Sequence, residues 1–315
     1  MEPHPENRKR SAKPSDRIIL GTGLLLILGF FALLALFFLV SMFTPSLVGK
    51  CVAVVEINQP LTVEGAAPSL FSDGIAGSEQ IAASIESLNN RDDVGAVVIV
   101  FNSGGGSVVA TREIYDSVID LNKPTVAYFR EVAASGAYYI ASGTDYIISD
   151  PNAITGSIGV ITTLTEMSSL FEKIGINVTT VKSGKFKDIG SPYREFTDEE
   201  QAILQALNEE VYNEFKSIVI ENRGSKLDMT KFENITDGRI MTGRQAVKVG
   251  LVDEVGNKKS AIMKAAELAG MSPQSYDEVR VCTVPTYGAE SSMFGVDSLI
   301  KQLQLQTNNP SISYK

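Results

Sequence analysis

The sequence predicts an α/β fold with a mostly parallel sheet, formed by one domain over about residues 50–285. Strand-like and helix-like runs alternate along this stretch, which is typical of parallel strands joined by helices. The segment Gly95–Phe101 (GAVVIVF) is a continuous apolar run, the pattern of a strand buried on both of its faces. Both observations indicate a central sheet inside the domain.

The expected elements follow one another at short intervals. We expect strands at Val52–Ile57, Gly95–Phe101, Pro124–Phe129, Tyr146–Ser149, Ser157–Ile161, Asn177–Lys182 and Glu278–Thr283. We expect helices at Gly77–Leu88, Val108–Leu121, from near Ser135, and at Thr165–Ile174, Thr197–Arg223, Gly243–Val249 and Asn257–Ala269. The apolar stripe of the long helix Thr197–Arg223 indicates packing on the core or on a neighbouring subunit. The polar residues 286–315 form a C-terminal tail.

Residues 18–43 run for 26 positions without a charge, as IILGTGLLLILGFFALLALFFLVSMF. As a helix they would be about 39 Å long, enough to cross a hydrocarbon core of about 30 Å. A cleaved signal peptide would have a shorter apolar core of about 7–15 residues. We therefore expect a transmembrane helix that is retained in the lipid bilayer.

The charges beside this segment predict its orientation. Residues 1–17 contain five basic and three acidic residues, so the positive-inside rule places this tail in the cytoplasm. We expect a single-pass protein of the cell membrane with an extracytoplasmic domain. The residues after this tail carry a net charge of about −11, which offers no electrostatic basis for binding nucleic acid.

Two cysteines, Cys51 and Cys282, are the only ones in the chain. An exported domain can join them in a disulfide that ties its first strand to its last, but we favour the alternative of two buried free thiols. The sequence has no cluster of Cys or His, so we expect neither a metal site nor a cofactor.

The lack of histidine limits the chemistry that this domain can perform. The only histidine in the chain is His4, in the predicted cytoplasmic tail. A Ser-His-Asp or Cys-His hydrolase is therefore excluded for the folded domain, as is a zinc site with histidine ligands. If the domain catalyses acyl transfer, its base must be Lys, Asp, Glu, Tyr or a water that they hold. Lysine suits a hydroxyl nucleophile, provided that its surroundings keep it neutral.

The glycine loop Ser103–Ser107 follows the predicted buried strand. Consecutive glycines allow backbone N–H groups to face an anion without interference from a Cβ. The loop lacks the Lys-Ser/Thr of a phosphate loop and the third glycine of a dinucleotide fingerprint. It is a candidate oxyanion hole, or a plain tight turn between a strand and a helix.

Two further segments could supply a nucleophile and a base. Ser135 lies among small residues at the expected start of a helix, where it could be a nucleophile or an ordinary N-cap. Three lysines, Lys182, Lys185 and Lys187, follow the expected strand 177–182. Such a cluster usually forms a solvated surface, and spacing alone selects none of the three as a base.

Several motifs in register resemble the signal peptide peptidase A family over about residues 50–270. They are the glycine loop, AASGAYY (133–139), TGSIGV (155–160), GKFKDIGSP (184–192), and GRIMTGRQA (238–246) with GLVD (250–253). This resemblance implies the spiral of ββα units that the family shares with Clp protease and the crotonases. The motifs match the short, single-domain form with an N-terminal anchor.

The resemblance also implies roles for individual residues. The family's nucleophile corresponds to Ser135, its lysine base to Lys187, and the hydroxyl that orients the lysine amine to Ser157. Gly106 and the Ser135 N–H would form the oxyanion hole, with Gly105 beside it. Relatives usually have proline where this chain has Gly104, so the loop loses a fixed φ.

By the same resemblance, we expect a serine endopeptidase with a Ser/Lys dyad that degrades remnant signal peptides through an acyl-enzyme on Ser135. Short members of the family form homo-oligomeric rings in which the serine of one protomer meets the lysine of another. Two alternatives are a non-catalytic scaffold that binds peptides at the membrane, and a crotonase-type enzyme that acts on acyl-CoA thioesters.

Overall fold

The computed structural model describes residues 30–31, 34, 49–67 and 74–284. From Lys50 onward the chain belongs to one compact unit. The predicted cytoplasmic tail and C-terminal tail lie outside the described residues, as does the predicted transmembrane segment apart from three positions. Within the described part of the chain, no helix is both long enough and apolar enough to cross a membrane.

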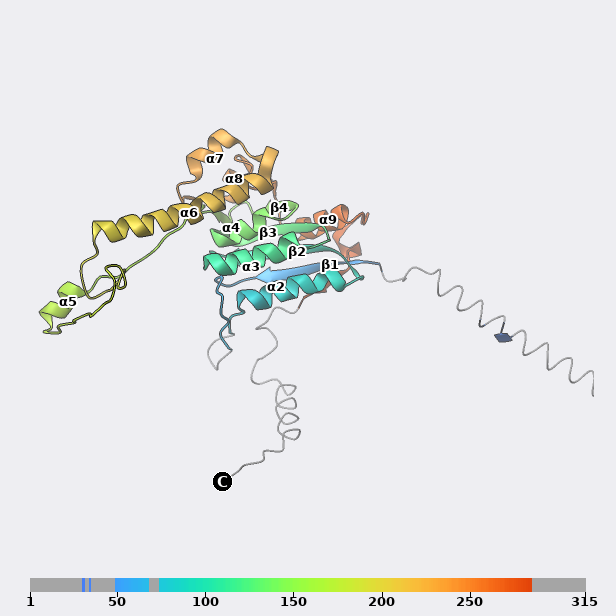
Figure 1. Ribbon diagram of the computed structural model, residues 1–315. Helices are drawn as coiled ribbons and strands as arrows, with labels where there is room; N and C mark the ends of the chain where they lie inside the picture. The colour runs from blue at the N-terminus through green and yellow to red at the C-terminus, as the bar shows by residue number, and fades with distance from the viewer. Residues whose placement is uncertain (1–29, 32–33, 35–48, 68–73, 285–315) are drawn as a thin grey trace, which may run out of the picture. The chain divides into compact units, whose positions relative to one another are not determined.

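A mixed sheet of eight strands forms the centre of this unit, as the alternating pattern predicts (Figure 1). One continuous path of strands has the order β6-β5-β3-β2-β1-β8, while β4 pairs with β3 and β7. Every pair is parallel except β5–β6. The strands are β1 (Cys51–Ile57), β2 (Val94–Ser103), β3 (Thr125–Ala134), β4 (Tyr146–Ser149), β5 (Ile154–Gly156), β6 (Ile240–Thr242), β7 (Glu254–Val255) and β8 (Val281–Thr283).

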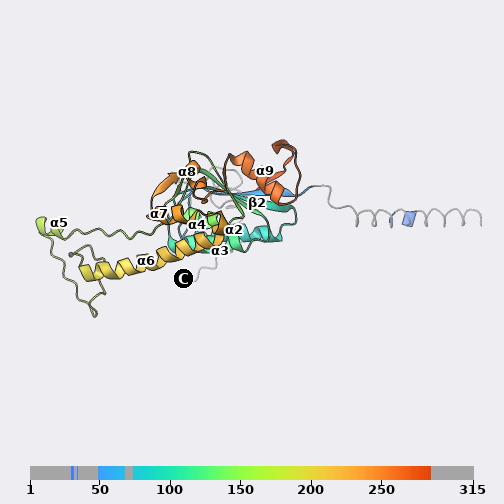
Figure 2. The same cartoon turned by 90° about the horizontal axis from the view of Figure 1, so that it is seen from above.

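Helices cover both faces of the sheet (Figure 2). Helix α9 packs on β1, β2 and β3 from one side, whereas α2, α3 and α4 lie on the other. The α-helices are α2 (Ser78–Glu86), α3 (Val108–Ile119), α4 (Gly136–Ser142), α5 (Ser168–Lys173), α6 (Asp198–Arg223), α7 (Met229–Ile235), α8 (Gly243–Val247) and α9 (Lys258–Leu268). Short 3-10 turns occupy Ser87–Asn90, Gly224–Lys226 and Tyr276–Glu278.

Strand β2 contributes to two separate hydrophobic cores. Its residues Val97, Ile99 and Phe101 belong to the core under α2 and α3, whereas Ala96 and Val98 belong to the core under α9. Successive side chains of a strand point to opposite faces, so a strand covered on both faces must be apolar throughout. This arrangement confirms the interpretation of the run GAVVIVF.

Strand β3 is longer than predicted, and two strands share one of its edges. Its first part, Val126–Phe129, pairs with β4, and its second part, Val132–Ala134, pairs with β5. The apolar run from which we predicted a strand at Pro124–Phe129 ends before Arg130, where β3 becomes exposed. The strand nevertheless continues to Ala134, because its last residues pair with β5. The extension carries the strand directly to Ser135.

Two of the predicted strands are wrong. The strand expected at 157–161 lies earlier, at β5, because the backbone turns into positive φ at Ser157. Residues 177–182 form no strand within the protomer, although their side chains suit one. The segment is exposed along its whole length and has no neighbouring strand there with which to form a ladder.

Residues 161–197 form an arm that extends away from the sheet together with the first half of α6 (Figures 1 and 2). The second half of α6 packs on α4 and buries Phe215 and Val219. In the arm, by contrast, Ile161 is 87% and Val181 is 96% exposed. The predicted apolar stripe of α6 is thus buried at Phe215 and Val219 but open to solvent at Leu207, which is 54% exposed.

Cys51 and Cys282 form a disulfide with a Cα–Cα distance of 5.9 Å, so our expectation of two free thiols is wrong. Strand β8 pairs in parallel with β1, which brings the two cysteines to neighbouring strands. The disulfide is the alternative that we considered less favoured, because the choice between the two depends on which strand lies beside β1, and a sequence separation of 231 residues does not decide this.

Arg223, at the end of α6, forms a buried ion pair with Asp253. The arginine side chain is 1% exposed, and its two terminal nitrogens each lie 3.0 Å from a carboxylate oxygen of Asp253. It also donates to the Gly250 carbonyl, while Asp253 accepts from the Ile147 N–H at 2.8 Å. Burial by itself would raise the pKa of Asp253. The bonds and charge of Arg223, together with the bonds from the Ile147 N–H and from Lys226 at 3.0 Å, outweigh it and hold that pKa below its ordinary value.

Replacing both cysteines by serine should lower the free energy of unfolding by about 2–5 kcal/mol, because the disulfide restricts a very long loop of the unfolded chain. Thermal unfolding of the wild type with and without a phosphine reductant measures this effect. The double variant serves as control, since the reductant should leave its midpoint unchanged. Equal midpoints for the wild type and the variant would contradict the assignment.

Asp253→Asn should destabilise the domain by about 3–5 kcal/mol, because it leaves the buried Arg223 charge without a partner. The wild-type contribution should be complete above the unfolded-state pKa of about 3.9 and should decline as the pH falls toward the lowered folded-state pKa. Unfolding midpoints measured across acid pH test both statements. Asp120→Asn, at the exposed end of α3, is the matched control and should change stability by less than about 0.5 kcal/mol.

Candidate active site

Three segments that were singled out from the sequence meet at the carboxyl ends of neighbouring parallel strands. Ser103 of β2 pairs with Ala133 of β3, and Ala134 of β3 pairs with Gly156 of β5. The residues that follow are therefore brought together: the glycine loop after β2, Ser135 after β3 and Ser157 after β5. This end of a parallel sheet is where open α/β folds bind ligands.

Ser135 lies on a strained turn between β3 and α4. Its φ of 53° and ψ of −126° are unusual for a residue with a side chain, and Ser157 has the same positive φ. Ser135 occupies the N-cap position of α4, but its side chain makes no capping hydrogen bond. A strained strand-to-helix turn with a serine at its apex exposes the hydroxyl, as in a nucleophile elbow. The capping alternative is thus not supported.

The glycine loop packs so closely that two of its glycines cannot carry side chains. A Cβ on Gly106 would lie 2.1 Å from the Leu61 carbonyl oxygen. Gly105 has a φ of 92°, and a Cβ there would lie 2.6 Å from the Gly136 nitrogen. Gly104, where relatives have proline, has no atom within 4 Å of such a Cβ. The loop is therefore constrained at Gly105 and Gly106 and open at Gly104.

Backbone N–H groups around Ser135 differ from the prediction in one respect. The Ser135 N–H donates to the Gly156 carbonyl at 2.9 Å, so it is not available to an oxyanion. Among the described residues, the N–H groups of Gly106 and Gly136 have no hydrogen-bond acceptor. Gly136 thus replaces the Ser135 N–H as the expected second donor. The position of Gly136 in the sequence could have indicated this role. The residue after a nucleophile on such a turn is the first of the helix, so its N–H has no acceptor within the helix.

Two adjoining pockets open at Ser135. One includes Gly106, Gly136 and Ser135 in its wall, together with side chains from α3, α4 and α6. The other is lined by Ser135, Ser157 and residues of α6 and the loop after α7. Both share the segment 159–161. Ser135 therefore lies in the walls of both pockets, with Gly106 in the wall of one and Ser157 in the wall of the other.

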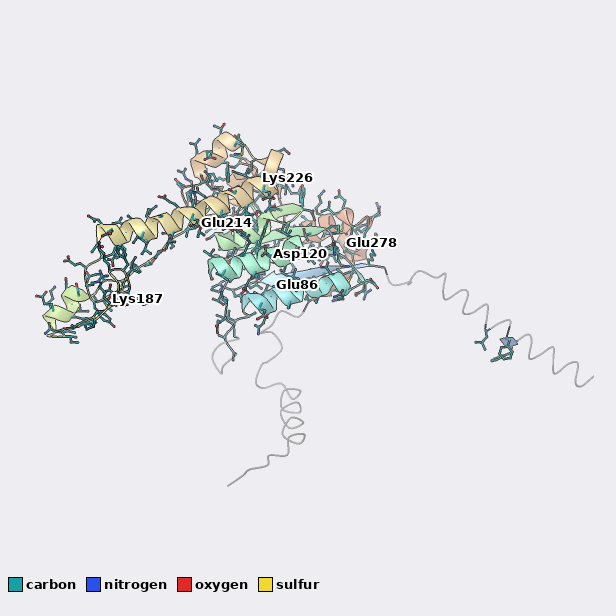
Figure 3. All side chains as sticks on the ribbon, in the orientation of Figure 1. Glu86, Asp120, Lys187, Glu214, Lys226 and Glu278 are labelled. Atoms are coloured by element: carbon teal, nitrogen blue, oxygen red, sulfur yellow. A yellow bond between two sulfur atoms is a disulfide. The ribbon has the colours of Figure 1, made fainter. Side chains whose placement is uncertain are left out.

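Lys187 does not belong to these pockets. Neither pocket at Ser135 includes it, and its side chain is exposed on the arm. Figure 3 shows Lys187 near α5, beyond the end of α6 that is remote from Glu214, whereas Glu214 lines the same pocket as Ser135. Within one protomer, the structure does not bring the two predicted dyad residues together.

An ion-pair network fixes the loop that carries Lys187. Arg194 donates to Asp188 at 2.8 and 2.9 Å and to both carboxylate oxygens of Glu200, near the start of α6. Lys182 also donates to Asp188, at 2.5 Å. Hydrogen bonds from Arg194 hold the pKa of Asp188 well below its usual range and lower that of Glu200 to about 2. Lys187 therefore projects from a loop that is tied to α6.

Comparison with known proteins identifies the family. Residues 118–272 match the sequence profile of peptidase family S49. A putative protease of Synechocystis is 42% identical over 191 residues, which cover 60% of this chain and 67% of that relative. The chain belongs to peptidase family S49. Two further relatives are a putative protease of Methanocaldococcus jannaschii and a putative signal peptide peptidase SppA of Enterococcus faecium.

The first of these is 43% identical over 190 residues, which cover 60% of each protein. The second is 34% identical over 197 residues, which cover 62% of this chain and 57% of that relative. The matched regions thus span about three fifths of the length of these three relatives. Membership of family S49 confirms the resemblance to the signal peptide peptidase A family.

Gly106→Ala should reduce the rate at which a fluorophosphonate labels Ser135 by about 100-fold or more, because the added methyl group displaces the loop that carries one of the two free N–H donors. Labelling followed by intact-mass measurement gives this rate. Gly104→Ala is the matched control and should label at close to the wild-type rate, since its methyl group enters open space. Equal labelling rates for the two variants would show that the Gly106 N–H does not stabilise the oxyanion.

Proposed function

We propose that this chain is a serine endopeptidase in which Ser135 is the nucleophile and Lys187 the general base. The strained backbone of Ser135, with its hydroxyl free of capping and two unbonded N–H groups beside it, is the observation that carries this proposal. Family membership supports the peptidase class, and the absence of histidine between residues 5 and 315 excludes a histidine base in the domain.

The proposed reaction is acyl transfer in two steps. Ser135 Oγ attacks the peptide carbonyl while neutral Lys187 accepts its proton, and the N–H groups of Gly106 and Gly136 stabilise the oxyanion. The C–N bond then breaks, and Lys187 returns the proton to the leaving amine. In the second step Lys187 takes a proton from a water, which attacks the ester carbonyl. The bond from the acyl carbon to Ser135 Oγ then breaks, Lys187 returns the proton to Ser135 Oγ, and the acid product is released. Ser157 would hold the lysine amine.

We further propose that Lys187 acts on Ser135 of a neighbouring protomer in a homo-oligomeric ring. The arm carries Lys187 away from the pocket of its own chain, which leaves a second copy as its natural partner. Exposed apolar side chains of the arm and of α6 offer the surface that such a contact would bury. These include Ile161, Leu170, Ile174, Ile176, Val178, Val181 and Leu207.

The proposal extends to the setting of the enzyme. Residues 18–43 would anchor it in the cell membrane with residues 1–17 in the cytoplasm and the active site on the extracytoplasmic side. Remnant signal peptides and other peptides near the membrane are the proposed substrates, because tethering raises their encounter rate. The sheet with its helices on both faces is proposed to be the family's spiral of ββα units, as in Clp protease and the crotonases.

Mixing Ser135→Ala and Lys187→Ala protomers should restore part of the peptidase activity that each variant lacks alone. In a ring with a dyad shared between subunits, some interfaces of the mixture pair an intact serine with an intact lysine. Hydrolysis of a quenched fluorescent peptide measures the recovery, with co-assembly confirmed by two different affinity tags. Full loss in co-assembled mixtures would show that the dyad is not shared in this way.

Serine-reactive labelling separates this proposal from its two rivals. The peptidase should lose fluorophosphonate label when Ser135 or Lys187 is replaced, because both groups are needed to activate the hydroxyl. A peptide-binding scaffold or a crotonase-type acyl-CoA enzyme should show no such dependence. Lys185→Ala, on the same loop, is the matched control, and its labelling should resemble that of the wild type.

A further inference from the structure

Three helices converge on the pocket that Ser135 shares with Gly106, and each adds one charged or phenolic side chain to its wall. These side chains are Arg112 from α3, Tyr139 from α4 and Glu214 from α6. Apart from Thr111, Ser135 and three glycines, the rest of the wall is apolar and is formed by Val108, Val160, Ile161, Val211 and Phe215. The catalytic scheme above uses none of the three polar groups, although they line the same pocket as the nucleophile.

The three polar groups are bonded to one another. Arg112 Nη1 donates to Glu214 Oε1 and, at 3.1 Å, to the Tyr139 hydroxyl, which in turn donates to Glu214 at 3.3 Å. Burial raises the pKa of Tyr139 to about 12, so its hydroxyl remains protonated at neutral pH. The Tyr139 ring packs against Tyr115 and Phe215, with centroids 5.0 and 5.1 Å away. Helix packing therefore holds this wall in place.

The ion pair is open to whatever enters the pocket. The Arg112 side chain is 48% exposed and that of Glu214 is 50% exposed. Each charge neutralises the other, and Arg112 also lies 3.4 Å from Asp116, which is outside the pocket wall. Because such exposed pairs contribute little to stability, the sequence has no strong folding reason to place one here.

We propose that the Arg112–Glu214 pair sets the side-chain preference of the enzyme for a residue that flanks the scissile bond. This inference rests on the proposed peptidase function. The pocket adjoins both the nucleophile and the Gly106 N–H, so a carbonyl held there places a neighbouring side chain in it. An apolar side chain packs on the aliphatic and aromatic wall without disturbing the pair. A charged side chain loses hydration and finds its opposite charge already bonded.

Removing one partner should therefore change the preference in a predictable direction. Glu214→Gln leaves Arg112 without its partner in the pocket, so acidic side chains should gain in kcat/KM relative to leucine. Arg112→Gln leaves Glu214 unpaired, so basic side chains should gain instead. We expect relative gains of about twofold to fivefold, the range that a half-exposed charge pair can supply.

The experiment uses the full chain in detergent and a set of quenched peptides in which the residues on either side of one bond are Leu, Glu or Lys. Mass spectrometry identifies the bond that is cut, and competition between peptides gives the ratios of kcat/KM. Glu233→Gln is the matched control, since Glu233 also pairs with a lysine of α6, at 2.7 Å, but lines neither pocket. Its ratios should equal those of the wild type.

A charge swap provides the second variant. Arg112→Glu combined with Glu214→Arg restores a neutral pair, so this protein should return to the wild-type preference for leucine. Cleavage by the wild type with unchanged ratios in both single variants would overturn the proposal, whether or not Ser135 is the nucleophile.

If the wild type cleaves none of the peptides, the proposed peptidase function fails by that result alone. Fluorescence anisotropy with labelled peptides and the Ser135→Ala chain then tests the pocket separately. Adding Glu214→Gln to the Ser135→Ala chain should tighten its binding of the acidic peptide, and adding Arg112→Gln should tighten its binding of the basic peptide. Both results would support the role of the pair. Equal affinities in all variants would refute it.

Discussion

The parallel register at the end of β3 is the constraint on which the site depends. Because Ser103 pairs with Ala133 and Ala134 pairs with Gly156, three loops must leave the sheet side by side. Backbone hydrogen bonds enforce this register, so the positions of Ser135, Ser157 and the glycine loop follow from the ladder and not from contacts between their side chains. A slip of one residue would turn Ser135 to the opposite face of the sheet.

The local strain of the site is supported by this same ladder. The Ser135 N–H bonds to Gly156, which fixes the turn at a φ that a serine rarely adopts. That bond uses the donor that the family pattern had suggested for the oxyanion, and it leaves the next N–H, of Gly136, free. Strain and donor geometry are therefore two results of one hydrogen bond.

The sequence predicted the regular parts of this fold because hydrophobic periodicity is a local property. The run GAVVIVF, the capping threonine of α6 and the glycine loop each specify their own structure. The sequence could not predict what depends on distant neighbours: the pairing of β8 with β1, the second edge partner of β3, or the wall formed by Arg112, Tyr139 and Glu214.

The strand expected at 177–182 shows the same limit, since its side chains are suitable but a neighbouring strand is lacking in the protomer. Lys187 could be selected only by its family resemblance, and its position on the arm depends on Arg194 and α6.

The disulfide between Cys51 and Cys282 closes residues 51–282 into one covalent loop, in which the first strand, β1, is joined to the last, β8. The arm, which is exposed from residue 161 to beyond residue 181, lies between these two ends. A single cut in the arm would consequently open the backbone without separating the two fragments. Ser135 lies on the fragment before the cut and α6 on the fragment after it, so both walls of the pocket would remain attached to each other in a nicked chain.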